Sequence, residues 1–320
     1  MIDLPLPPGM PGAGTQGPTI VGLDVGGSKT RVALSVAGRV STCTVGSANV
    51  ASVSPAEVAA ALDDVVAWLG QHGRTTAEDV TVVCAGAAGV DSPETMVRLR
   101  RHLSQRFPRA RIHVVHDSRL ILAACGLDAG TVVISGTGAV AWGRRPDGHE
   151  ARAGGWGYLL GDEGSGYGIV RAAVRQALRE VDTGRAPGRL TAALMEACAR
   201  KHPWELLDLF YAQPERHYWA GLSAVVLDLA GQDDPVSLGI VAEGARALAD
   251  LALTVTSRLG TAGPIVLAGG LMRHVPDYGG RVSALLAQAG QHQVRVLQSD
   301  PVLGAIRLAE KLAHAPSPLH

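Results

Sequence analysis

The order of expected strands and helices starts twice in this chain. Residues 19–24 form a short apolar run that ends in glycines, and residues 30–36 read as its hairpin partner. Alternating helices and strands follow, and then the order restarts with a strand over 131–135, a glycine turn and a second strand over 139–144. The two halves share no close residue-level repeat. The order of elements alone predicts a duplicated α/β fold with two mixed-sheet lobes.

Local signals place several helices within this order. Ser54, Pro55 and Glu57 combine an N-cap, a proline at the first helical position and a capping box. The second half carries a long helical section from about residue 164 to 259, which predicts a helical insertion in that lobe. A closing helix over 302–312 follows the last expected strand.

Composition excludes several classes of function. Acidic and basic residues balance at 29 each, so a nucleic-acid partner is not expected. An apolar run of ~18 residues, the length that crosses a membrane, is lacking. Residues 1–18 are rich in proline and glycine and lack a basic start, which predicts a disordered extension rather than a signal peptide. We expect a cytoplasmic protein.

The four cysteines are widely spaced and form no C-x-x-C pair; they are Cys43, Cys84, Cys125 and Cys198. Two lie in apolar runs, so buried free thiols in a reducing compartment are expected. The spacing does not favour a zinc or iron–sulfur site.

The first glycine turn, residues 24–30, suits a polyphosphate. Its glycines let backbone N–H groups approach phosphate oxygens, while Asp24 at the strand end can hold Mg²⁺ through water. Neither the Walker A pattern nor the dinucleotide fingerprint is present. An ordinary hairpin turn remains an equal alternative for this segment by itself.

Two further glycine turns have similar chemistry. Residues 135–138, Ser-Gly-Thr-Gly, offer N–H groups and two hydroxyls at the start of the second half. Residues 268–270, Ala-Gly-Gly, follow an apolar strand and suit close approach of an adenine or ribose. A simple strand-to-helix turn explains this last segment equally well.

Asp117 follows an expected strand over 112–115, at the sheet edge where open α/β sheets place ligands. A carboxylate there can accept a hydroxyl proton while that oxygen attacks phosphorus. The alternative is that Asp117 caps the next helix.

Residues 154–166 hold the densest signal in the chain. So many glycines are costly in a plain strand, and with Trp156 and Asp162 they fit a loop that wraps a polar ligand. An indole face can cover a sugar ring, and a carboxylate can bind its hydroxyls. Trp156, Tyr158 and Leu160 look buried, which argues against a mobile surface loop.

Taken together these residues resemble the N-acetylglucosamine kinases and their BadF/BadG/BcrA/BcrD-type ATPase relatives, in the superfamily that unites sugar kinases, actin and heat-shock chaperones. The resemblance covers nearly the whole chain after Thr19. It implies a two-lobed actin-like ATPase (ribonuclease H-like) fold, with Mg-ATP held between the lobes. The N-terminal lobe would span 19–117, closed by the returning helix 302–313, and the C-terminal lobe 118–301.

The resemblance also implies roles for individual residues. Asp117 would be the general base, and Asp24 would hold magnesium. The ATP-binding residues would be Gly26, Gly27, Ser28, Lys29, Thr30, Ser135, Gly136, Thr137, Gly138, Gly269 and Gly270. The sugar-binding residues would be Asn49, Asp117, Thr137, Gly155, Trp156 and Asp162. Animal N-acetylglucosamine kinases carry an asparagine where this chain has Val140, so one sugar hydrogen bond is expected to be missing.

The leading hypothesis is therefore an ATP-dependent kinase that phosphorylates the 6-hydroxyl of N-acetylglucosamine, with glucosamine and N-acetylmuramic acid as alternatives. Family members are often homodimers, and a homodimer is expected. A second hypothesis is an ATPase that activates a partner enzyme, but such activators need cysteines placed for a bridging iron–sulfur cluster. A third, a sugar-sensing regulator, would need a DNA-binding segment before the first strand, and residues 1–18 are too short for one.

Overall fold

A computed structural model of the chain describes residues 17–72, 75–90, 92–260 and 263–314. Contacts divide the chain into two compact units: unit 1 comprises Met1–Asp128 and Ser299–His320, and unit 2 spans Ala129–Gln298. The predicted extension over residues 1–18 lies outside the described residues except for Gly17 and Pro18.

Unit 1 is built on a mixed five-stranded sheet in the order β3-β2-β1-β4-β5. The strands are β1 (Ile20–Val25), β2 (Lys29–Val36), β3 (Arg39–Gly46), β4 (Val82–Ala87) and β5 (Arg111–His116). The first three pair antiparallel, as the predicted hairpin requires, while β4 and β5 run parallel to β1. The carboxyl ends of β1, β4 and β5 therefore share one edge.

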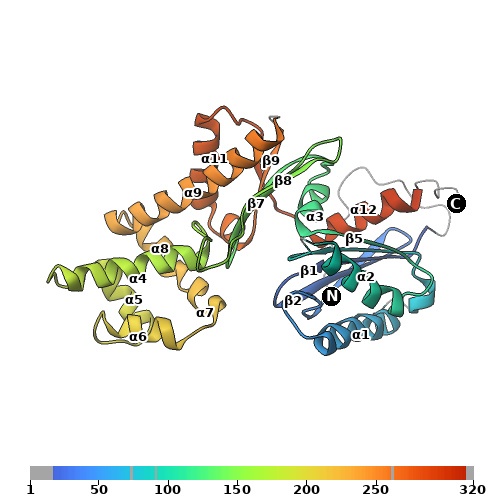
Figure 1. The fold of residues 1–320 in the computed structure, drawn as a ribbon, viewed down its shortest axis with the longest axis horizontal. Coiled ribbons are helices and arrows are strands. Elements are labelled where there is room, and N and C mark those ends of the chain that lie inside the picture. Colours follow the sequence, from blue (N-terminus) through green and yellow to red (C-terminus); the bar gives the residue numbers. More distant parts are fainter. Residues whose placement is uncertain (1–16, 73–74, 91, 261–262, 315–320) are drawn as a thin grey trace. The chain divides into compact units, whose positions relative to one another are not determined.

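Helices cover both faces of this sheet (Figure 1). On one face lie α1 (Pro55–His72) and α2 (Pro93–Arg106), and on the other lie α3 (Asp117–Ala124) and α12 (Val302–His314); a short 3-10 turn, η1 (Ala77–Asp79), precedes β4. The predicted capping box is present at α1, where Ser54 and Glu57 exchange hydrogen bonds of 2.8 and 3.3 Å.

The unit boundary differs from the sequence prediction, which placed it after residue 117 and before 302. The division falls after Asp128 and before Ser299 because α3 packs on α12. Arg307 of α12 also donates to the carbonyls of Ala123 and Ala124, at 3.0 and 2.8 Å.

Unit 2 repeats the mixed five-stranded sheet, in the order β10-β9-β6-β7-β8. The strands are β6 (Gly130–Ser135), β7 (Ala139–Arg144), β8 (Glu150–Gly154), β9 (Ile265–Ala268) and β10 (Val294–Val296). As predicted, β6 and β7 form a hairpin. β8 was not predicted; it pairs with β7 and leads directly into the loop that begins at Gly154.

The helical insertion of unit 2 separates β8 from β9. It comprises α4 (Gly166–Asp182), α5 (Arg189–Ala197), α6 (Glu205–Ala212), α7 (Arg216–Gly221), α8 (Ser223–Ala230) and α9 (Pro235–Leu259), the green-to-orange group in Figure 1. The long α9 packs on β6, β7 and β8, and α10 (Gly270–His274) and α11 (Pro276–Gln288) follow β9. Trp219 is in the core at 1% exposed, whereas Trp204 and Tyr211 on the insertion are exposed.

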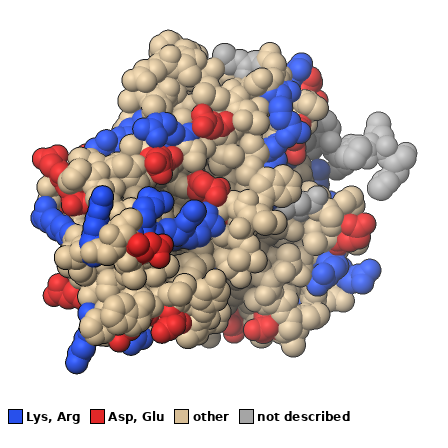
Figure 2. All heavy atoms as spheres, turned by 60° about the vertical axis from the view of Figure 1, so that its left-hand side comes forward, with Lys and Arg blue, Asp and Glu red and all other residues tan. Residues whose placement is uncertain are grey.

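The surface in view carries side chains of both charges. On the face drawn in Figure 2, acidic and basic side chains lie intermingled, in keeping with the balanced composition. None of the helices among the described residues is long and apolar enough to cross a membrane.

Candidate functional site

Two carboxylates lie at the shared carboxyl edge of the unit 1 sheet. Asp24 is near the end of β1, and Asp117 follows β5 as the first residue of α3. In the parallel pairing of β1 with β4, Gly86 lies opposite Asp24. A Cβ on Gly86 would lie 2.3 Å from the side chain of Leu120, so only glycine lets α3 pack this closely on the sheet.

Asp117 is available for chemistry because it does not cap α3. The residue at the N-cap position is His116, whose Nδ1 lies 3.0 Å from Oδ1 of Asp117 and 3.3 Å from the Ser118 backbone nitrogen. When Nδ1 carries a proton it donates to Asp117 and cannot also accept from Ser118. Burial raises the pKa of Asp117, but the hydrogen bond and charge of His116, with hydrogen bonds from Ser118, outweigh it and hold that pKa below its usual value. The side chain keeps 23% of its surface exposed. Asp117 is therefore an ionised, reachable carboxylate at neutral pH.

The pKa of Asp24 is shifted in the opposite direction. Burial, then the charges of Asp117 and Asp300, raise the pKa of Asp24 to about 7, while Lys29 lowers it. Asp300 was not singled out in the sequence. It precedes α12, where its Oδ1 accepts from the Val302 N–H at 3.2 Å and its Oδ2 accepts from Nε of Arg31 at 2.9 Å. The sequence signal that could have identified Asp300 is the Asp-Pro pair immediately before the closing helix.

This arrangement fits a divalent cation that arrives with a phosphate ligand. A buried carboxylate with two acidic neighbours is stabilised when a cation offsets their charge. Among the described residues no group of three or more acidic, histidine or cysteine side chains is close enough to form a complete metal cage. Mg²⁺ commonly keeps several waters and uses one or two carboxylates plus phosphates, which is the role predicted for Asp24.

The first glycine turn is compact and mostly accessible. The Gly26 N–H donates to the carbonyl of Lys29 at 3.0 Å, and Gly27, Ser28 and Lys29 are exposed. Thr30 corrects the prediction: its side chain is fully buried, and its hydroxyl accepts from the Ala48 N–H at 2.9 Å. The Thr30 side chain therefore supports the turn from the interior.

Asn49 lies beside this turn and is already engaged. It is 3% exposed; its amide donates to the Ala88 carbonyl and its Oδ1 accepts from the Ala51 N–H, both at 2.9 Å. One amide hydrogen and one lone pair of Oδ1 are left for a ligand. The structure therefore gives Asn49 mainly a supporting place.

The second glycine turn, residues 135–138 in unit 2, is fixed from several sides. The Ser135 hydroxyl donates to the Gly164 carbonyl, and the Gly166 N–H at the start of α4 donates to the Gly136 carbonyl, both at 2.8 Å. Just after the turn, the Ala139 N–H donates to Asp162 at 3.0 Å. Thr137 is left at the apex of a rigid turn.

The predicted adenosine turn adjoins this phosphate turn. Gly269 has φ +98°, and a Cβ there would lie 2.2 Å from the Ser135 carbonyl oxygen. Glycine is thus required for the two turns to touch. Gly270 is exposed beside them, at the start of α10. Unit 2 therefore brings the residues 135–138 and 269–270 into one place, as the sequence predicted for nucleotide binding.

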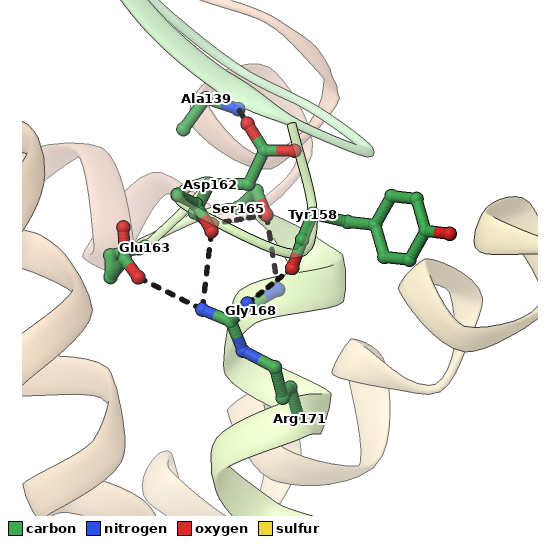
Figure 3. Close-up of polar contacts among 8 residues, drawn as sticks. Ala139, Tyr158, Asp162, Glu163, Ser165, Gly168 and Arg171 are labelled. Atoms are coloured by element: carbon green, nitrogen blue, oxygen red, sulfur yellow. Dashed lines mark hydrogen bonds and ion pairs between the residues drawn. The ribbon is translucent and has the colours of Figure 1, made fainter. Parts of the chain in front are cut away.

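Asp162 joins the 154–166 loop to the second turn. It is 7% exposed and has φ +64°; its Oδ1 accepts from Ala139, and its Oδ2 has no hydrogen bond among the described residues. Its carbonyl accepts from the Ser165 hydroxyl, which in turn caps α4 by accepting from the Gly168 N–H (Figure 3). One carboxylate oxygen is left for a ligand.

Arg171, which the sequence did not single out, holds the loop from beneath (Figure 3). Its guanidinium donates to the carbonyls of Tyr158 and Gly161 and to the Glu163 carboxylate, the last two at 3.1 and 2.9 Å. The Arg171 side chain thus binds three groups of the loop, two backbone carbonyls and one carboxylate.

The predicted burial of Trp156, Tyr158 and Leu160 is wrong. They are 70%, 36% and 83% exposed, and in Figure 3 the Tyr158 ring points away from the hydrogen-bonded cluster. The loop is ordered through its backbone, by Arg171 and by left-handed glycines, so its apolar side chains need not pack inside. The guanidinium of Arg152 lies 5.7 Å from the Trp156 ring.

A small cavity of ≈ 190 Å³ lies where this loop meets α9. Trp156, Leu160, Asp162 and Glu163 line it together with residues of β7, β8 and α9. The indole and the carboxylate predicted for sugar binding therefore share one hollow. Gly155 is not one of its lining residues; the Gly155 N–H donates to the Ala139 carbonyl at 3.0 Å and its carbonyl accepts from Arg152 at 2.8 Å.

Comparison with known proteins agrees with this chemistry. The sequence pattern of the BadF/BadG/BcrA/BcrD ATPase family matches residues 21–309. A Clostridium acetobutylicum protein named N-acetylmuramic acid/N-acetylglucosamine kinase is 32% identical over 235 residues, covering 72% of this chain and 76% of that protein. A Dictyostelium discoideum protein named N-acetyl-D-glucosamine kinase is 29% identical over 313 residues, covering 90% and 97%.

Solved structures match over nearly the full chain. A candidate N-acetylglucosamine kinase from Porphyromonas gingivalis superposes with a TM-score of 0.73 at 22% identity, covering 93% of this chain and 100% of that one. At this identity the likeness concerns the fold. It confirms the predicted class, two α/β units of the actin-like ATPase type with a helical insertion in the second.

Proposed function

Because this chain belongs to the BadF/BadG/BcrA/BcrD ATPase family, we propose that it is an ATP-dependent kinase that phosphorylates an amino sugar. The observation that carries the proposal is Asp117, an ionised and reachable carboxylate at the sheet edge that is held by the side chain of His116. The names of two relatives support an amino sugar: both include N-acetylglucosamine, and one also includes N-acetylmuramic acid.

In this proposal Asp117 accepts the proton of the sugar 6-hydroxyl. As the O–H bond breaks, the hydroxyl oxygen forms a bond to the terminal phosphorus of ATP, and the bond from that phosphorus to the bridging oxygen breaks to release ADP. A lowered carboxyl pKa makes Asp117 a weak base, so its main work is to orient the oxygen in a loose transition state. His116, 3.0 Å away, holds the carboxylate in place.

The proposed nucleotide-binding elements are the glycine turns, taken in each unit by itself. In unit 1, Gly26, Gly27, Ser28 and Lys29 offer N–H groups and a cation. In unit 2, the proposed nucleotide-binding residues are Ser135, Gly136, Thr137, Gly138, Gly269 and Gly270. Mg²⁺ bound to the phosphates beside Asp24 would supply charge neutralisation for the transferred group.

The sugar would bind along the 154–166 loop of unit 2. The free Oδ2 of Asp162 can accept from a sugar hydroxyl, and the exposed Trp156 indole offers a face for the ring. Asn49 and Thr137 would add single hydrogen bonds, and Gly155 would allow close approach. Val140, beside Gly155, offers no hydrogen bond, so glucosamine and N-acetylmuramic acid are kept as alternatives to N-acetylglucosamine.

The thiols argue against an iron–sulfur activator. All four cysteines are free, and Cys84 and Cys198 are buried. Burial raises the pKa of Cys84 to about 12 and that of Cys43 to about 11, which disfavours the thiolate that a cluster requires. We further propose a cytoplasmic homodimer, following the family resemblance, with light scattering of the pure protein as the test of its mass.

A coupled assay of ADP release tests the proposed function. The protein with Mg-ATP is given N-acetylglucosamine, glucosamine, N-acetylmuramic acid or glucose, with a reaction lacking sugar as the control. We expect N-acetylglucosamine to stimulate ADP release most and its 6-phosphate to appear in equal amount. If no sugar stimulates turnover above the control, the kinase assignment is wrong.

A further inference from the structure

One contact at the second glycine turn comes from far along the chain. Oγ1 of Thr137 lies 3.0 Å from Nδ1 of His217, a hydrogen bond between residues 80 positions apart. His217 belongs to α7 in the helical insertion, a region for which the sequence analysis gave no role in the site.

The position of His217 is fixed by the core beneath it. Trp219 of the same helix is 1% exposed, and its indole N–H donates to the Gln213 carbonyl at 2.8 Å. The Trp219 ring also packs against Phe210, with ring centroids 4.6 Å apart. A buried indole thus anchors α7, while His217 on the same short helix remains exposed.

The partner of His217 is equally well placed. The turn around Thr137 is fixed by hydrogen bonds at Ser135, Gly136 and Ala139, so the backbone at the apex is rigid. What those bonds leave undetermined is the Thr137 side chain, which has three staggered rotamers. The bond to His217 selects one rotamer and occupies one side of the hydroxyl.

From this geometry we infer that His217 is a positioning residue of the kinase site, which holds the Thr137 hydroxyl in the orientation that binds the phosphate chain of ATP. The inference rests on the function proposed above. A hydroxyl has one donor and two acceptor sites, so with one taken by the imidazole the remainder is directed at the ligand. The helical insertion would thereby contribute to the nucleotide site through one side chain.

A double-mutant cycle tests this inference in the full-length protein. The set is wild type, Thr137→Ala, His217→Ala and the double variant, with kcat and KM for ATP measured at saturating N-acetylglucosamine. We expect His217→Ala to lower kcat/KM for ATP by about three- to tenfold, the worth of one neutral hydrogen bond. In the Thr137→Ala background the same change should have no further effect.

Two more variants separate positioning from folding. His217→Asn, whose amide reaches the position of Nδ1, should restore most of the activity. His202→Ala is the matched control, since His202 is an exposed histidine of the same insertion that stacks on Trp204 away from the turn. Two results would overturn the inference. One is a kcat/KM for ATP in His217→Ala equal to that of wild type. The other is a loss of kcat/KM on His217→Ala that is just as large in the Thr137→Ala background.

The dissociation constant for Mg-ATP, measured by calorimetry on the same four proteins, keeps the two proposals separable. If no sugar stimulates turnover but the binding cycle still shows coupling between positions 137 and 217, the kinase function falls and the positioning role stands. If sugar-dependent turnover is normal and neither cycle shows coupling, the positioning role falls and the kinase stands.

Discussion

Two aspartates at one sheet edge have different surroundings, which assign them different work. The contacts of His116 and Ser118 hold the pKa of Asp117 below its usual value, whereas desolvation and two acidic neighbours raise the pKa of Asp24 to about 7. Carboxylates whose environments separate their pKa values commonly divide the roles in an active site. In the proposed mechanism the ionised Asp117 would accept the proton of the sugar hydroxyl, and Asp24, whose acidic neighbours disfavour its charged form, suits a cation.

Replacement of the proposed base should abolish turnover and leave binding intact. We expect Asp117→Asn to lower kcat by about 10²- to 10⁴-fold, because the amide cannot accept the proton. Calorimetric affinities for ATP and sugar should stay close to wild type. Asp128→Asn, which alters an exposed ion pair with Lys311 in the same unit, is the control. Near-normal rates in Asp117→Asn would remove Asp117 from the mechanism.

Asp24 should make stability depend on pH in a direction that can be measured. Its carboxyl pKa is raised from 3.8 to about 7, so between these values the folded protein holds a proton that the unfolded chain has lost. By linkage, the contribution of Asp24 to the free energy of unfolding is fully present below pH 3.8 and is lost as the pH rises to about 7.

We therefore expect Asp24→Asn, which carries no charge, to be more stable than wild type at pH 8, by a margin on the order of a few kcal/mol. This difference in stability between the two proteins should shrink toward pH 4, and added Mg²⁺ should reduce it at pH 8. Thermal unfolding of both proteins across this range measures it. Parallel curves for the two proteins would show that Asp24 does not carry the raised pKa.

At the scale of elements, the 154–166 loop is ordered by one helix side chain. Arg171 donates to two loop carbonyls and to Glu163, and hydrogen bonds from a charged group are among the stronger ones. We expect Arg171→Ala to raise the KM for the sugar by roughly tenfold, with a smaller change in kcat. Limited proteolysis should also cut this loop faster.

Arg175 provides the matched control, one turn further along α4. It is exposed and makes no hydrogen bond or ion pair among the described residues. Arg175→Ala should behave as wild type in both measurements. Equal effects from the two variants would mean that the loss reflects the charge of α4 rather than the hold on the loop.

The same elements show how far sequence reasoning reached. The hairpins, the glycine turns and the capping box at Ser54 could be predicted because their signals are local in the chain. β8 was missed because Ala151, Arg152 and Ala153 are too short a run to stand out before a glycine-rich loop. The exposure of Trp156 could not be predicted, since it depends on Arg171 ordering the backbone from a distant position.

Residues that act through long-range contacts were missed for the same reason. Asp300 reaches Arg31 across 269 positions, and His217 reaches Thr137 across 80. Conversely, Thr30 has the residue type that the phosphate motif requires, but its hydroxyl accepts a hydrogen bond from the Ala48 N–H. A motif gives the residue type, whereas packing decides which polar group is still free.

At the scale of the whole molecule, each unit has its own core. Ile306 of α12 is 2% exposed in the unit 1 core, and Leu286 of α11 is fully buried in that of unit 2. We expect Ile306→Ala to destabilise unit 1 by about 2–5 kcal/mol. Hydrogen exchange should then speed up in β1, β4 and α3 and stay slow in β6 and β9.

Leu286→Ala is the reciprocal variant and should give the opposite pattern, with faster exchange in β9 and β10 and protection retained in β1 and β4. The pair of variants tests whether the units unfold as separate cooperative blocks. Uniform acceleration across both sheets in either variant would show a single block instead.

The return of α12 to the first sheet has a consequence for synthesis on the ribosome. Strands β1 to β5 emerge early, but the face that holds Ile20, Ala33 and Cys84 is covered by α3 alone until residues 302–314 have been translated. Unit 2, although it is made later, is continuous in sequence and can complete its own core first. The growing chain thus carries an unfinished sheet while most of its length is made, and that interval is when a chaperone or an early stop codon would matter most.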